Sequence, residues 1–272
     1  MEGLIKYWGF YLVAVPDVNG VGIRDLRNAL DLVANYRGWV SDLHWVSPGQ
    51  RAAQNDINSQ IASRVFHRVL AARIVVFRFF LQVVIQVDGN LQEKHKRIWL
   101  LFQLFDFLSP HGGSFHPFIR ILDKLRGTSD ESLNTLICGF NSIIDEYIPG
   151  SRFILALDEA QQATRLYPYS GISSINPKVY RSIIRDIVQV FTKVSVKLVV
   201  SGTGLSLADL EEATASGVSK PAQGVKVFHE LGMFDTWPKL KSFVGRYVPL
   251  STLESHSGYG LQVRMREYLL GR

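Results

Sequence analysis

The sequence contains almost no cysteine, with Cys138 the single one among 272 residues. One cysteine cannot form a disulfide within the chain or a Cys-x-x-Cys cluster, and His-Glu-x-x-His is missing too, so no zinc site is predicted. Cys138 lies in an apolar run, where a cysteine acts more often as a small hydrophobic residue than as a nucleophile. The N-terminus has no basic stretch ahead of an apolar one, so no signal peptide is predicted and an intracellular protein is expected.

Two glycine motifs of enzymes are missing as well. No Gly-x-Ser-x-Gly elbow occurs, which argues against an α/β-hydrolase, and His111-Gly112-Gly113 without that elbow indicates a turn. None of the 22 glycines is followed by lysine. The loop Gly-x-x-x-x-Gly-Lys-[Ser/Thr], which holds the phosphates in P-loop proteins, therefore does not occur in these residues.

The composition is that of a globular protein with a small positive charge. Hydrophobic residues make up 47% and charged residues 20%, which excludes a disordered chain. Thirty Lys and Arg against 24 Asp and Glu give a formal charge of +6, which permits an anionic partner such as a nucleotide or a nucleic acid without requiring one. The basic residues at 94–97 are more typical of a solvated helix face than of nucleic-acid contact.

The most apolar stretch, residues 69–87, has the length of a membrane span. Its thirteen Val, Leu, Ile and Phe residues favour insertion by about 4–8 kcal/mol, whereas Arg73 and Arg78 oppose insertion by about 5–7 kcal/mol. Arg78, Gln82 and Gln86 share one side of a helix, which indicates a polar stripe, and Arg73 lies opposite. The pattern favours an amphipathic helix facing a protein core, with a membrane anchor through residues 69–87 as the alternative.

Strands and helices alternate along the chain. Apolar runs that end in polar residues predict buried strands at 8–15, 152–157 and 196–200. Helical spacing of apolar residues predicts helices at 23–36, 57–87, 91–108, 118–125, 133–147 and 179–191. This order predicts an α/β fold with a parallel sheet in a single domain, in which residues 57–147 form a long helical insertion. Residues 225–272 are expected to begin a C-terminal helical region.

The second strand ends in the strongest motif of the sequence. Residues 153–157 are apolar and lead directly into Asp158 and Glu159. This order is typical of a Walker B element, in which the aspartate binds Mg²⁺ and the glutamate polarises the attacking water. The alternative is a strand that ends in two solvated acids.

Polar residues also follow the third predicted strand, at 196–200. It leads into residues 201–204, Ser-Gly-Thr-Gly, and we expect it to lie beside the second strand in one sheet. Ligands of parallel sheets bind at the carboxyl ends of the strands, where Asp158, Ser201 and Thr203 would meet. Ser201 or Thr203 matches the position of a sensor I residue, which contacts the γ-phosphate or the water. The alternative is a glycine turn followed by a helix capped by Ser206.

Four segments together resemble fungal P-loop ATPases of the Crinkler type. They are residues 8–25, the Leu-Asp-Glu-Ala-Gln motif at 157–161, and residues 201–207 and 232–237. Such proteins join an additional-strand ATPase domain to a restriction-endonuclease-like domain. The resemblance implies a P-loop NTPase-like core that binds ATP and Mg²⁺. It implies that Asp158 binds the metal, that Glu159 and Ser201 are catalytic, and that Thr203 contacts the nucleotide.

The missing phosphate loop is a departure from this family. In the family the loop precedes a helix that leads into the strand at 8–15, so we expect the chain to start after its phosphate loop and to stop before the lid and nuclease. The resemblance then implies a truncated or degenerate ATPase domain with weak or no nucleotide hydrolysis. The alternative is a non-enzymatic interaction module, or a remnant without activity.

Overall fold

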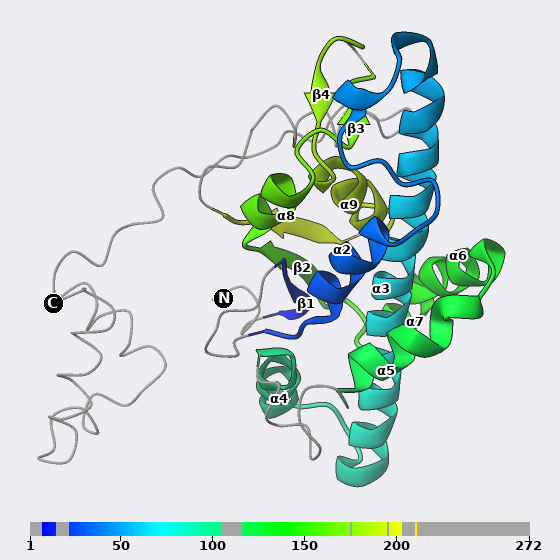
Figure 1. Ribbon diagram of the computed structural model, residues 1–272. Coiled ribbons are helices and arrows are strands. Elements are labelled where there is room, and N and C mark those ends of the chain that lie inside the picture. The colour runs from blue at the N-terminus through cyan, green and yellow to red at the C-terminus, as the bar shows by residue number, and fades with distance from the viewer. Residues whose placement is uncertain are drawn as a thin grey trace, which may run out of the picture. The chain divides into compact units, whose positions relative to one another are not determined.

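The computed structural model describes residues 7–14, 22–104, 116–174, 176–194, 196–202 and 210 (Figure 1). The chain divides into two units, Met1–Val225 and Lys226–Arg272, and every described residue belongs to the first. Thr203 and the region predicted at 225–272 lie outside the described residues. The predictions made for them therefore stay predictions.

A parallel sheet lies at the centre of the described residues. Its strands are β1 (Trp8–Val13), β2 (Phe153–Asp158) and β5 (Lys197–Val200), in the order β1-β2-β5. Leu155 of β2 pairs with Phe10 on one side and with Leu198 on the other. The predicted α/β class, the parallel sheet and the pairing of the second strand with the third are confirmed.

Burial explains why these segments form strands. All six residues of β1 are buried, which is the continuous apolar run expected of a strand covered on both faces. In β2 the buried residues alternate with half-buried ones, so Phe153, Leu155 and Leu157 face one side of the sheet. On the opposite side, Leu100 and Leu104 pack in a smaller cluster with Tyr11, Val13 and the half-buried side chains of β2. Side chains therefore pack on both faces of β1 and β2, whereas Lys197 and Val199 of β5 are exposed.

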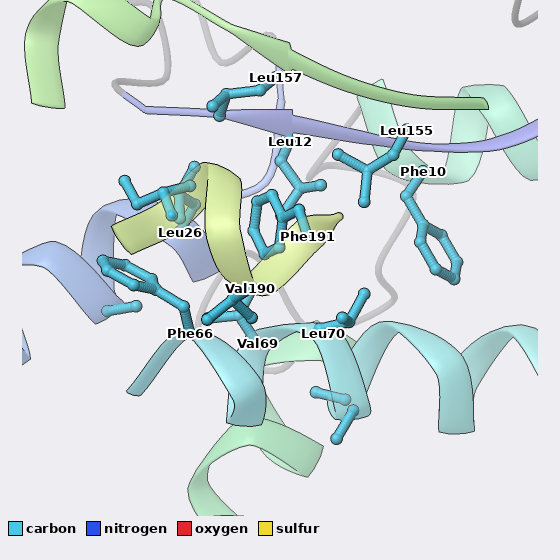
Figure 2. Close-up of a cluster of buried hydrophobic side chains, with 14 of the residues drawn as sticks. Phe10, Leu12, Leu26, Phe66, Val69, Leu70, Leu155, Leu157, Val190 and Phe191 are labelled. Carbon is cyan, nitrogen blue, oxygen red and sulfur yellow. The ribbon is translucent and has the colours of Figure 1, made fainter. Parts of the chain in front are cut away.

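The helix α3 (Arg51–Asp88) packs along one side of the sheet and is 38 residues long, or about 57 Å. Figure 2 shows its side chains meeting those of the strands and of α9 (Ile184–Phe191) in the main core. The labelled core residues are Phe10, Leu12, Leu26, Phe66, Val69, Leu70, Leu155, Leu157, Val190 and Phe191. The helical stretch Pro48–Asp88 is long and apolar enough to cross a membrane, but half of its most apolar window is buried inside the protein.

The helix α3 begins six residues earlier than the apolar pattern predicts. The first turns of α3 are mostly polar and so lack the helical spacing of apolar residues. Hydrogen bonds from their side chains join them to neighbouring loops. Gln54 donates to the carbonyl of Gly38 at 2.6 Å, and Asn58 donates to the carbonyls of Val40 and Ser170, each at 2.7 Å. Side-chain hydrogen bonds therefore order a turn that hydrophobic spacing does not reveal.

The remaining elements follow the predicted order with three corrections. They are α2 (Asp25–Ala34), α4 (Glu93–Leu104), α5 (Pro117–Lys124), α6 (Asp130–Cys138), α7 (Phe140–Tyr147) and α8 (Ala160–Leu166), the strands β3 (Gly171–Ile172) and β4 (Tyr180–Arg181), and the 3-10 turns η1 (Leu43–Trp45), η2 (Pro48–Gln50) and η5 (Leu125–Gly127). The helix predicted at 133–147 is divided at Gly139, a weak helix former. The helix predicted at 179–191 begins at Ile184 because β4 pairs with β3. The helix α8 lies directly after residue 159, where the sequence predicts no helix.

Arg73 lies in the middle of α3 and is fully buried. Its guanidinium donates two hydrogen bonds to the carboxylate of Asp25, at 2.6 and 2.7 Å. It also donates to the backbone carbonyl of Tyr11 and to the side chain of Gln103, and it stacks 4.0 Å from the Phe118 ring. Arg73, which the helical pattern places opposite the polar stripe, is thus a core residue of α3 that bonds to α2, α4 and β1.

Among the described residues, side chains of α4 and no further strand bond to the outer edge of β1. Gln103 accepts a hydrogen bond from the amide of Tyr11 at 3.0 Å and donates to the carbonyl of Gly9 at 3.1 Å. The Trp99 indole donates to the same carbonyl at 2.7 Å. The amide group of Gln103 thus replaces the two hydrogen bonds that a neighbouring strand would make.

Candidate functional site at the carboxyl edge of the sheet

The carboxylate of Asp158, the last residue of β2, gathers side chains from both neighbouring strands. Its Oδ1 accepts from the hydroxyl of Ser201 at 2.7 Å, and its Oδ2 accepts from the hydroxyl of Tyr11 at 2.7 Å. The amide of Glu159 also donates to Oδ1, at 2.9 Å. Asp158 and Ser201, both proposed from the sequence, are therefore in direct contact, and Tyr11 is a third member of the site.

The backbone around Gly202 explains this contact. The ladder between β2 and β5 continues one residue past β5, because the amide of Ser201 donates to the carbonyl of Leu157 at 2.9 Å. The carbonyl of Ser201 then accepts from the amide of Ala160 at 3.0 Å. A Cβ atom on Gly202 would lie 2.1 Å from Gln161 Oε1 and 3.1 Å from the Gln161 amide. Glycine at 202 therefore lets the two strand ends approach closely.

Glu159 has the strained backbone of the site. Its φ of 53° is the single positive value of a non-glycine residue within the described parts of the chain. A side chain other than glycine in this left-handed region costs about 1–3 kcal/mol, and such residues are frequent at functional sites. The Glu159 side chain is exposed and accepts a hydrogen bond from Gln161 Nε2 at 2.5 Å. The Glu159 carboxylate does not bond to Tyr11 or Ser201, as Asp158 does, and it faces solvent.

Tyr11 donates a hydrogen bond to Asp158 through its phenol hydroxyl. Burial, followed by the hydrogen bond to Asp158 and the charges of Asp158 and Glu159, raises the pKa of the Tyr11 phenol far above its ordinary value of 10.0. The phenol therefore keeps its proton across the neutral range and donates to Asp158 throughout it. Sequence reasoning missed Tyr11, although a tyrosine in a strand with no other polar side chain is a signal, because a buried hydroxyl needs a partner.

Asp158 fits a magnesium ion as a single carboxylate ligand. Its two oxygens offer about four lone-pair positions. Three of them accept hydrogen bonds, so Oδ2 keeps one position for an ion or for an ion-bound water. The described residues hold no group of three or more His, Cys, Asp or Glu side chains that could bind a metal by themselves. This donor set suits the way Mg²⁺ binds when one carboxylate and substrate phosphates share its coordination.

Replacing Tyr11 by phenylalanine is expected to lower the free energy of unfolding by about 1.5–3 kcal/mol, because Asp158 loses a charge-assisted hydrogen bond. Urea denaturation at pH 7 would measure the change. Tyr169→Phe is the control, since the Tyr169 hydroxyl makes no hydrogen bond to any described residue, and it should change stability by less than about 0.5 kcal/mol. Equal stability of Tyr11→Phe and the wild type would contradict the contact.

Comparison of the chain with known proteins gives no match to a protein-family model, to a curated protein or to a solved structure. The resemblance to Crinkler-type P-loop ATPases accordingly stays a prediction from the motifs.

Proposed function

We propose that the carboxyl edge of the sheet is the metal and water half of an ATPase site, in a P-loop ATPase-like domain that retains Walker B and sensor I elements. The observation that carries the proposal is the 2.7 Å hydrogen bond from Ser201 to Asp158, which joins the two motifs across neighbouring parallel strands. The position of Asp158 at the end of the middle strand supports it further, since parallel sheets bind ligands there.

Each side chain would have a separate role. Asp158 would hold a magnesium ion through the remaining position on Oδ2, and the ion, when bound with ATP, would neutralise charge on the phosphate oxygens. Glu159, whose carboxylate is exposed, would orient the attacking water. Ser201 fixes the rotamer of Asp158 and would lie close to the terminal phosphate. Thr203 stays a proposed nucleotide contact by its place in the motif.

The missing phosphate loop limits the expected activity. In P-loop proteins the glycine-rich backbone and the motif lysine bind the phosphates, and these 272 residues contain no Gly-Lys pair. Most of the nucleotide-binding free energy is therefore absent. We propose a degenerate ATPase domain, with weak ATP affinity and no measurable turnover by this chain.

A second candidate function is a non-enzymatic interaction module. It is favoured by the three hydrogen bonds on Asp158, which satisfy most of the carboxylate without any ligand. In that case Asp158 would serve only to fasten the ends of three strands. The two functions differ in whether a metal reaches the carboxylate.

Manganese distinguishes the two functions, because Mn²⁺ replaces Mg²⁺ and broadens NMR signals of nearby nuclei. With Mn²⁺ and ATP added to the whole chain, we expect the amide signals of Asp158, Glu159 and Ser201 to broaden, with a Kd on the order of 1 mM, or about −4 kcal/mol. Asp158→Asn should abolish this broadening. The control Asp130→Asn removes a carboxylate that lies outside the site, and it should leave the broadening unchanged.

Two outcomes would contradict the ATPase proposal in different ways. No broadening at Asp158 with millimolar Mn²⁺ and ATP would reject a metal site and favour the interaction module. Micromolar ATP binding would show that another part of the chain cradles the phosphates, which the missing loop argues against.

A further inference from the structure

A polar groove lies away from Asp158, on the side of α3 that faces α6 and α9. It has a volume of about 710 Å³ and is lined by α3, α6, the end of α9 and the turn after α2. A volume of this size suits a small organic molecule. Its lining does not include Asp158, Glu159 or Ser201, so it is independent of the site described above.

The acids in the lining of the groove are already paired. Asp130 accepts two hydrogen bonds from Arg64, both at 2.8 Å, and the pairing lowers the pKa of Asp130. Asp186 pairs with Arg185 at 3.3 Å. The cations Arg37 and Lys193 also line the groove, are exposed, and form no ion pair or side-chain hydrogen bond with any described residue. The charge left over in the groove is therefore positive, which favours an anion.

The groove also contains a buried polar atom without a partner. His67 is 8% exposed and lines the groove. Its Nδ1 lies 3.3 Å from the hydroxyl of Ser63, whereas its Nε2 has no hydrogen-bond partner among the described residues. An unpaired buried nitrogen costs about 1–3 kcal/mol, and a ligand oxygen at Nε2 would recover that energy. In the tautomer in which the Ser63 hydroxyl donates to Nδ1, the ring proton is on Nε2 and can be donated to a ligand oxygen.

The imidazole is neutral around pH 7. Burial, and secondarily the charge of Lys193, lowers the pKa of His67 to about 4. The charged groups around it are Lys193 in the turn after α9, Asp130 on α6, and Arg64 and Arg68 on α3. A neutral imidazole near Lys193, in a groove that Arg37 also lines, can bind an anion without adding a buried charge.

We propose that this groove binds an organic phosphate monoester, with its phosphate near Lys193, Arg37 and His67 and its apolar body against Tyr36, Ile61 and Val190. A phosphate monoester carries nearly two negative charges at neutral pH, which matches the two unpaired cations. The guanidinium of Arg37 can bind two phosphate oxygens in a planar fork. The apolar wall gives the organic part a surface that inorganic phosphate cannot use.

Titration of the whole chain with phenyl phosphate, followed by the NMR signals of the His67 ring, tests the proposal. We expect saturable binding, at least tenfold tighter than binding of inorganic phosphate and of benzoate. Bound phosphate should raise the pKa of His67, because a nearby negative charge favours the imidazolium. Lys193→Gln should weaken binding at least tenfold, and Lys178→Gln, which removes an exposed lysine outside the groove, should not.

Four results would overturn the proposal. Equal affinity for phenyl phosphate and inorganic phosphate would indicate an adventitious ion only. Equal affinity for benzoate would reject the phosphate class. Phenyl phosphate binding that Lys193→Gln leaves unchanged, or no saturable binding at all, would reject the groove. Asp158→Asn should have no effect on this titration, which separates the result from the ATPase proposal.

Discussion

Asp25→Ala is expected to lower the free energy of unfolding by about 3–5 kcal/mol, because it leaves the Arg73 guanidinium buried without its counter-charge. Both side chains of the pair are almost completely buried, so solvent cannot replace the lost carboxylate. The hydrogen bonds from Arg73 to Tyr11 and Gln103 remain but carry no negative charge. Urea or thermal denaturation at pH 7 would measure the loss.

The double variant Asp25→Leu with Arg73→Met separates the charge from the packing. Replacing a buried ion pair by apolar residues of similar size is often close to neutral. We expect the double variant to recover most of the loss, less about 1–2 kcal/mol for the contacts of Arg73 with Tyr11 and Gln103. A double variant less stable than Asp25→Ala would show that the pair is needed for more than mutual neutralisation.

Trp99→Ala is expected to destabilise the protein by a similar amount, about 3–5 kcal/mol. Trp99 is 1% exposed, and its ring contacts the rings of Phe10, Phe77 and Phe118. Its loss would leave a large cavity between α4, α3 and β1. Denaturant unfolding monitored by far-UV circular dichroism would measure the effect without relying on tryptophan fluorescence.

Trp99→Phe is the matched control for that cavity. It keeps an aromatic ring in the cluster and removes the indole hydrogen bond to Gly9, whose carbonyl keeps Gln103 as a partner. We expect a loss of about 1–2 kcal/mol. If Trp99→Phe were as damaging as Trp99→Ala, the hydrogen bond at the edge of β1, and not the ring packing, would dominate.

The sequence predicts the sheet well because each of its strands is an apolar run that leads into polar residues. It predicts Asp158 and Ser201 as neighbours for the same reason, since both follow strands that lie side by side. It cannot predict the partners of Arg73, because Asp25, Tyr11 and Gln103 come from three other elements. In the hydrophobic pattern, Arg73 is visible only as one charged residue within an apolar stretch.

Tyr11 and His67 show the same limit in the two proposed sites. Each is buried by residues far away in the chain, and the partner of each hydroxyl or ring nitrogen depends on packing that no local pattern encodes. Glu159 is similar, since nothing in the local sequence indicates its positive φ. A buried polar residue in an apolar segment is a useful signal that a partner exists, but it does not name the partner.

The closed outer edge of β1 has a consequence for folding during synthesis. Trp8 pairs with Phe153, so β1 leaves the ribosome about 145 residues, or roughly 7–30 seconds, before its partner strand β2. An apolar strand with open edges would be prone to aggregate over that time. Arg73, Trp99 and Gln103, which hold the outer edge of β1, all precede residue 105, so this protection can form early. We therefore expect β1 to pack on α3 and α4 first. The other edge of β1 then stays open until β2 pairs with it.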